Sequence, residues 1–169
     1  MMKFFMLLFF SCVQIFAFNA EYKSFSSDFT QNIRSINSNI IYKGKFVLTQ
    51  NEAFWSYEKP NNKQIFINAK EVVILEPDLE QVTYSSLKDI PNLSQIFKKA
   101  KQISSTQYQA KYQQTTYDIR LENDEIKSIA YKDDLDNEVL ITLHNQKRDI
   151  PIDKRLFKTK IPAHYDVLR

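Results

Sequence analysis

The spacing of hydrophobic residues changes near Ile40, and the change separates two kinds of predicted element. Between residues 22 and 36 the apolar positions lie three or four apart, which is the spacing of one stripe on an amphipathic helix. These positions are Tyr22, Phe25, Phe29, Ile33 and Ile36. The pattern predicts a helix over residues 22–36 that packs its stripe against the rest of the protein.

From Ile40 onward apolar and polar residues alternate, as in strands that bury one face. Such runs, separated by turn-forming residues, cover residues 40–50, 53–59, 63–69, 72–77 and 81–86. The chain's only tryptophan, Trp55, shares one face of its strand with Ala53 and Tyr57, whereas Phe54 lies on the other face. Short strands at this spacing predict an antiparallel meander.

A second helical stripe interrupts the strands between residues 89 and 101. Its apolar residues are Leu93, Ile96, Phe97 and Ala100. This short amphipathic helix is predicted either as a flap over the sheet or as a plain connector. Alternating runs then return at residues 106–113, 116–122, 126–132, 138–145 and 156–162. The whole pattern, about ten strands and two or three helices, predicts a mainly β protein of the α+β class.

The first residues have the composition of a secretory signal peptide. Lys3 precedes an apolar run that ends near the small residues Ala17 and Ala20. The run is shorter than the ~20 residues that a membrane-spanning helix needs, so an uncleaved anchor is the less favoured alternative. We expect a signal peptide over residues 1–20, cleaved after about Ala17 or Ala20, and one domain over residues 21–169.

Composition excludes several classes of protein. With 43% apolar residues and 14% aromatic residues the chain can bury a real core, which excludes general disorder. The net charge of +3 is too weak, and the basic and acidic residues are too interleaved, to indicate a nucleic-acid partner. The single glycine, Gly44, excludes glycine-rich phosphate loops. The turns must therefore be made by Asn, Asp and Pro.

The residues indicate no catalytic, metal or cofactor site. The best candidate for a metal site is the acidic cluster Asp133, Asp134, Asp136 and Glu138. This cluster lacks the central glycine of a calcium loop and is interpreted as a solvated hairpin turn. The two histidines, His144 and His164, have no partner at ligand spacing, and no serine has the glycine context of a nucleophile elbow. We therefore expect no catalytic residue, no metal and no cofactor, and a protein that is not an enzyme.

Three segments, in this order along the chain, resemble the LolA family of periplasmic lipoprotein carriers. FSSDFTQNI, residues 25–33, is similar to the F-x-x-x-F-x-Q opening of the family. Residues 54–87 resemble its central block of tryptophan strand, proline turn and Asp-Leu-Glu-Gln-Val strand. Residues 136–151 and 157–168 are similar to its closing strand and Asp-Val terminus. The resemblance covers nearly the whole chain that follows the expected signal peptide.

The resemblance implies an incomplete antiparallel β-barrel of about eleven strands with a helical lid over a hydrophobic cavity. It implies a monomeric carrier in the periplasm of a Gram-negative bacterium, with no cofactor. Its partners would be triacylated lipoproteins as cargo, an inner-membrane ABC transporter of the LolCDE type, and an outer-membrane acceptor that is LolB-like or of another kind. The implied lipid-binding wall consists of Phe46, Leu48, Ala53, Trp55, Tyr57, Ile65 and Ile67. The implied lid consists of Phe25, Phe29, Leu93, Ile96 and Phe97.

The sequence departs from the family pattern in front of the tryptophan strand. Family members usually carry an arginine there, which helps to hold the lid and to drive one-way transfer. In this chain the segment is Leu48-Thr49-Gln50-Asn51, with no basic residue. Either weaker contacts from Thr49 or Gln50 hold the closed state, or the acceptor step differs.

Two alternatives share the same fold. One is a LolB-like receptor anchored in the outer membrane through a lipid on Cys12, the only cysteine, although the preceding Phe9-Phe10-Ser11 fits a lipidation site poorly. The other is a lipid-sensing module that transports nothing. The mass of the mature N-terminus separates the receptor from the carrier, and depletion separates the sensor, because only loss of a carrier strands lipoproteins in the inner membrane.

Overall fold

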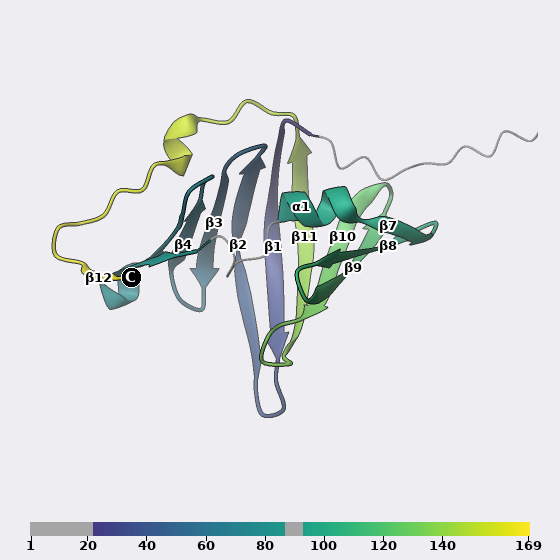
Figure 1. Ribbon diagram of the computed structural model, residues 1–169, viewed down its shortest axis with the longest axis horizontal. Coiled ribbons are helices and arrows are strands. Elements are labelled where there is room, and N and C mark those ends of the chain that lie inside the picture. Colours follow the sequence, from purple (N-terminus) through teal and green to yellow (C-terminus); the bar gives the residue numbers. More distant parts are fainter. Residues whose placement is uncertain (1–21, 87–92) are drawn as a thin grey trace, which may run out of the picture.

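The computed structural model describes residues 22–86 and 93–169, which form one open sheet of twelve strands (Figure 1). The strands follow the order β12-β6-β5-β4-β3-β2-β1-β11-β10-β9-β8-β7. Neighbouring strands are antiparallel, except that β12 lies parallel to β6. Within the described residues the edge strands β12 and β7 do not pair, so the barrel is incomplete, as the family resemblance predicts.

The first half of the sheet contains the predicted meander. Its strands are β1 (Ser24–Arg34), β2 (Asn39–Thr49), β3 (Ala53–Lys59), β4 (Lys63–Ile67), β5 (Val72–Glu76) and β6 (Gln81–Ser85). The strands β2 to β6 confirm the five alternating runs between residues 40 and 86. A short 3-10 helix, η1 (Pro77–Leu79), joins β5 to β6.

The second half of the sheet follows a single α-helix, α1 (Leu93–Lys99), which confirms the described part of the helix predicted over residues 89–101. The strands are β7 (Lys101–Ser104), β8 (Gln107–Tyr112), β9 (Thr115–Glu122), β10 (Glu125–Lys132) and β11 (Glu138–Arg148). The strand β7 was not predicted, and it begins where the predicted helix was still expected to continue.

The helix predicted over residues 22–36 is wrong. This segment is the central strand β1, which pairs along its length with β2 on one side and β11 on the other. The strand hides its alternation because two polar residues, Ser27 and Gln31, lie among Phe25, Phe29 and Ile33 on the same strand face. Because Ser27 and Gln31 are polar, the apolar residues on this strand face lie four positions apart, which resembles the spacing of a helix.

The strand predicted over residues 156–162 is also wrong. The chain forms a 3-10 helix, η3 (Lys154–Phe157), whose first turn is capped by the Asp153 carboxylate accepting a hydrogen bond from the backbone N–H of Arg155. From there the C-terminal segment runs past the side of the sheet to β12 (Asp166–Leu168), beside β6 (Figure 1). The expected signal peptide, its cleavage positions and Cys12 lie outside the described residues.

The sheet has two apolar faces of unequal extent. The face that α1 covers, here named the inner face, carries the larger hydrophobic cluster, to which strands from both halves of the sheet contribute. The outer face has a smaller cluster of Phe66, Val73, Leu75 and Val82, against which Tyr165 of the C-terminal segment packs. The turns confirm the prediction from the scarcity of glycine, because among the described residues five of the seven non-glycine positions with positive φ are Asn or Asp.

Candidate functional site

The inner face brings together all seven residues of the predicted wall. Register places them in rows across adjacent strands, with Leu48 beside Ala53 and Ile67, and Phe46 beside Trp55 and Ile65. Tyr57 lies opposite Gly44 in the next row. All seven belong to the inner cluster or pack against it: Phe46, Leu48, Ala53, Trp55, Tyr57, Ile65 and Ile67.

The centre of this face is a group of aromatic rings around Trp55. The indole stacks on Phe46 with ring centroids 4.6 Å apart and meets the edge of Phe29 at 5.2 Å. Phe29 also contacts Tyr57 at 5.1 Å. These offset and edge-to-face arrangements suit aromatic quadrupoles, and they leave Trp55 only 7% exposed. In this arrangement of the chain, Trp55 is part of the packed core.

The residues of the predicted lid fall into two groups. Leu93, Ile96 and Phe97 form the buried stripe of α1 and pack into the inner cluster, with 4%, 0% and 2% exposure respectively. Phe25 and Phe29 are not on a helix; they lie on β1 and belong to the wall itself. The physical reason is that β1 pairs with strands on both sides, so its apolar residues extend the floor beneath α1.

Thr49, which with Gln50 is one of two alternative contacts for a closed state, makes its described side-chain hydrogen bonds within the β2–β3 turn. Its hydroxyl lies 3.2 Å from the carbonyl oxygen of Glu52 and accepts a bond from the Glu52 backbone N–H at 3.1 Å. The backbone N–H of Thr49 donates to the same carbonyl at 2.8 Å. Thr49 therefore fixes a turn.

The inner face also carries polar groups, of which only Tyr57 was predicted as a site residue. Tyr42, Tyr57, Tyr117 and Tyr131 lie on it, and so does the buried Gln31. Burial is the largest cause of a raised pKa for the hydroxyls of Tyr57, Tyr117 and Tyr131, because it disfavours the phenolate. Their alternation with polar residues was visible in the sequence, but nothing there distinguished a tyrosine of the core from one of a site.

The acidic cluster near residue 133 is a hairpin turn, as predicted. The Asp133 carboxylate accepts hydrogen bonds from the backbone N–H groups of Leu135 and Asn137, each at 2.9 Å, and from the Asn137 side chain at 2.9 Å. The turn joins β10 to β11. Among the described residues, no group of three or more His, Cys, Asp or Glu side chains is placed to hold a metal ion.

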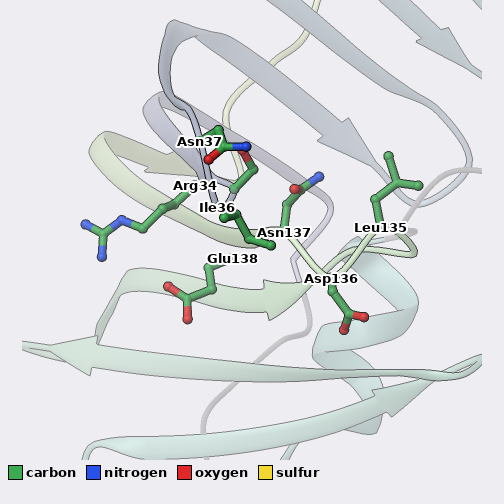
Figure 2. A pocket seen from close by; sticks show the side chains of 8 residues that line it. Arg34, Ile36, Asn37, Leu135, Asp136, Asn137 and Glu138 are labelled. Atoms are coloured by element: carbon green, nitrogen blue, oxygen red, sulfur yellow. The ribbon is translucent and has the colours of Figure 1, made fainter.

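A hollow of about 490 Å³ lies beside this turn, where the β1–β2 hairpin approaches it. Figure 2 shows its lining, with Arg34, Ile36 and Asn37 from one hairpin and residues 135–138 from the other. Ile36 is fully exposed and Leu135 is 81% exposed. The hollow lies outside the predicted wall, at the end of β1 farthest from Phe25.

Comparisons with known proteins point to one family. The family profile described as outer membrane lipoprotein carrier protein LolA matches residues 20–102. An outer-membrane lipoprotein carrier protein of Campylobacter jejuni is 45% identical over 169 residues, with all of both chains covered. A protein of the same description from Wolinella succinogenes is 35% identical over 149 residues, which covers 86% of this chain and 87% of that protein.

Solved structures support the fold. A crystal structure of a LolA superfamily protein from Nitrosomonas europaea superposes with a TM-score of 0.56 at 9% sequence identity, covering 82% of this chain and 91% of the other. In the part of the chain described here, no helix is both long and apolar enough to cross a membrane.

Proposed function

The chain belongs to the family of outer-membrane lipoprotein carrier proteins, LolA, and from this premise we propose that it binds the acyl chains of lipoproteins and carries them across the periplasm. Its cargo is released at the inner membrane and delivered to the outer membrane. The chain acts as a carrier and chaperone and needs no catalytic residue. Its relatives are named as outer-membrane lipoprotein carrier proteins, which supports this assignment.

The observation that carries the proposal is the apolar inner face beneath α1. Seven predicted wall residues share this face with Phe25 and Phe29, and the only α-helix among the described residues covers it with Leu93, Ile96 and Phe97. An apolar wall offers acyl chains burial without directional bonds. We propose that this wall receives the chains when α1 moves away from it.

Release limits how tightly the wall can hold its cargo. Burying acyl chain is worth about 0.8 kcal/mol per methylene, so complete burial of three chains would exceed any affinity that permits delivery. A movable α1 resolves this conflict because its own apolar stripe competes with the ligand for the same wall. The seven residues of α1 are too few for a stable isolated helix, which makes its position depend on this packing.

The proposed partners follow the transport route. Cargo comes from an inner-membrane ABC transporter of the LolCDE type, and an outer-membrane acceptor, LolB-like or of another kind, receives it. The carrier works as a periplasmic monomer after removal of residues 1–20 by cleavage after about Ala17 or Ala20. With Thr49 committed to a turn, we propose that packing of α1, in place of a polar latch near β3, holds the closed state.

Co-purification tests the carrier function. The protein is isolated from the periplasm and analysed by mass spectrometry for bound lipoprotein, while depletion of the protein is followed by fractionation of the two membranes. We expect triacylated lipoprotein in the purified sample and lipoproteins stranded in the inner membrane after depletion. Absence of bound lipoprotein together with normal sorting would refute the proposal.

Intact mass of the purified chain tests its mature form. A chain that starts near residue 18 or 21 supports the soluble carrier. A chain that begins at Cys12 with added lipid mass would instead establish the receptor alternative.

A further inference from the structure

Four tyrosines and one glutamine cross the inner face below the aromatic group, and we name them the tyrosine belt: Gln31, Tyr42, Tyr57, Tyr117 and Tyr131. Gln31 of β1 lies opposite Tyr42 of β2. The ring of Tyr42 meets that of Tyr57 nearly at right angles, with centroids 5.7 Å apart. On the other half of the sheet, the rings of Tyr117 and Tyr131 lie 4.9 Å apart.

The belt connects the two halves of the curved sheet. Tyr57 is on β3 and Tyr131 is on β10, and three strands separate them in the sheet. Both side chains nevertheless pack against the inner cluster, to which strands from both halves of the sheet contribute.

The belt runs obliquely across the strands: Tyr57 lies in the row of Phe29, Gln31 and Tyr42 lie in the next row, and Tyr131 lies in the row of Ile33. Successive inward-facing positions of β1 run from Phe25 through Phe29 to Gln31, and the strand then leads to the β1–β2 hairpin. The aromatic group around Trp55 thus lies on one side of the belt, and the hollow of Figure 2 lies on the other. A ligand that crosses the belt would meet the apolar aromatic group on one side and the β1–β2 hairpin on the other.

The chemistry of the belt is that of neutral hydrogen-bond donors. Tyr57 and Tyr131 are partly buried, and both rings pack against the inner cluster. A ligand carbonyl that reaches such a hydroxyl accepts a neutral hydrogen bond from it and so gains binding energy. These phenols are protonated, and hence able to donate, at neutral pH, because the ordinary pKa of a tyrosine is 10.0 and burial raises it further.

The charges near the belt disfavour an anionic ligand. Lys63, opposite Tyr57 in the register, is already paired with Glu76 at 3.0 Å. Asp133 and Asp134 lie near the end of the belt formed by Tyr117 and Tyr131. After larger causes, the charge of Asp133 raises the pKa of Tyr131, and the charge of Asp134 raises that of Tyr117. A phosphate group would face these carboxylates, whereas an ester or amide carbonyl carries no net charge.

We propose that the tyrosine belt donates hydrogen bonds to the ester and amide carbonyl oxygens that join the acyl chains to the lipid-modified N-terminus of the cargo. The inference rests on the proposed carrier function and adds a polar subsite to it. The chains then point toward Phe46 and Trp55, and the cargo polypeptide leaves toward the hairpin end. The belt thereby fixes the direction of a ligand that the apolar wall alone would bind in any orientation.

Two lipopeptides that differ only in their carbonyl groups test the subsite. One is a triacylated lipopeptide with ester-linked chains, and the other has the two esters replaced by ethers. Binding to the protein purified from the periplasm is followed by the fluorescence of Trp55, the only tryptophan of the chain. The variants are Tyr57→Phe and Tyr131→Phe, with Tyr84→Phe on the outer face as the matched control.

We expect the wild-type protein to bind the ester lipopeptide about fivefold more tightly than the ether analogue, as for the loss of one or two neutral hydrogen bonds. Each belt variant should bind the ester form about fivefold more weakly and show a smaller difference between the two ligands. The Tyr84→Phe control should behave as wild type. Thermal unfolding checks that each variant is folded, and if Tyr57→Phe is not, Tyr42→Phe replaces it.

The contrary outcomes are distinct. Wild-type protein that binds both lipopeptides equally well, or belt variants that keep the wild-type preference, would overturn the subsite and leave the carrier function standing. Wild-type protein that binds neither lipopeptide would overturn the carrier function itself. Phosphatidylglycerol serves as a third ligand: if the belt variants lose affinity for it and not for the ester lipopeptide, the carbonyls recognised are those of phospholipid and the assignment to cargo is wrong.

Discussion

At Gly44 the strands β2 and β3 approach each other more closely than a side chain would permit. A Cβ atom at this position would overlap the carbonyl oxygen of Ser56 and lie 3.0 Å from the tip of the Phe29 ring. The register between the strands shifts at this point, between Lys43 and Gly44. The only glycine of the chain is therefore required chiefly by the close approach of the Ser56 backbone, and secondarily by the Phe29 ring.

We expect Gly44→Ala to lower the free energy of unfolding by about 2 kcal/mol, because backbone cannot yield as a flexible side chain can. Urea denaturation measures the change. Lys45→Ala, in the same strand, is the control: the side chain of Lys45 is 63% exposed and its ion pair with Glu58 is 3.8 Å long, so little should change. Equal stability of Gly44→Ala and wild type would show that the strands can separate at this point.

Asp133 organises the β10–β11 turn through its charge. Burial by itself would raise the pKa of this carboxyl, but the hydrogen bonds from Asn137 and Leu135 outweigh burial and lower the pKa below its ordinary value of 3.8. A carboxyl whose pKa is lower in the folded state than in the unfolded state stabilises the folded state at pH values above its unfolded-state pKa. This stabilisation is lost as the pH falls through the folded-state pKa.

Asp133→Asn should therefore reduce stability at pH 7, and the difference from wild type should narrow as the pH falls below 3.8. Urea denaturation at several pH values measures this narrowing. Asp134→Asn, an exposed neighbour in the same turn, controls for the loss of one negative charge. A constant difference at all pH values would mean that the shape of the side chain, and not its charge, holds the turn.

At the level of single elements, the sequence predicted strands well wherever one face is uniformly apolar. The strands β2 to β6 and β8 to β11 meet that condition, at least in part of their length. The strand β1 does not, since Ser27 and Gln31 interrupt its inner face. The Ser27 hydroxyl is within 2.8 Å of the carbonyl oxygen of His144 on β11, so a tertiary contact that the sequence could not reveal makes the polar residue acceptable there.

The remaining errors involve elements that depend on distant partners. Residues 156–162 alternate like a strand, but no neighbouring strand pairs with them in the described structure. The strands β7 and β12 have four and three residues, too few to produce a recognisable pattern, and they exist because β8 and β6 pair with them. Short edge strands of this kind follow from the rest of the sheet.

The helix α1 depends on its contacts in the same way. We expect Phe97→Ala to loosen α1, because a helix of seven residues retains its structure only through the burial of Leu93, Ile96 and Phe97. Hydrogen exchange of the amides in residues 96–99 should become faster, while exchange in β1 and β2 should change little. Lys98→Ala, on the exposed side of the helix, is the control. Unchanged exchange in Phe97→Ala would contradict a helix held by its apolar stripe.

At the scale of the whole molecule, the seven residues predicted for the wall lie on one face of the sheet, whereas those predicted for the lid lie on two elements, α1 and β1. The wall positions alternate along β2, β3 and β4, so a correct strand assignment put all of them on one face. Phe25 and Phe29 lie on the strand β1, although the spacing of apolar residues in this segment predicts a helix. The tyrosine belt was not predicted, since its members come from five strands and become a group only when the sheet curves.

The burial of three tyrosine side chains makes the stability of the molecule sensitive to alkaline pH. Burial is the main cause of the raised pKa values of Tyr22, Tyr57 and Tyr131, which stand above the ordinary 10.0 of an exposed tyrosine. A group whose pKa is higher in the folded state stabilises that state fully at pH values below its unfolded-state pKa. This stabilisation is lost as the pH rises through the folded-state pKa. The unfolded chain ionises first, so each of these tyrosines favours unfolding above pH 10.

We therefore expect the urea midpoint to fall steeply from about pH 10 upward, with tyrosinate absorbance rising together with the loss of circular dichroism. In the double variant Tyr57→Phe and Tyr131→Phe the fall should be shallower, because two of the ionising groups are gone. An unchanged slope in the double variant would show that the two hydroxyls ionise as readily in the folded state as in the unfolded one. The burial of these two hydroxyls on the inner face would then be wrong.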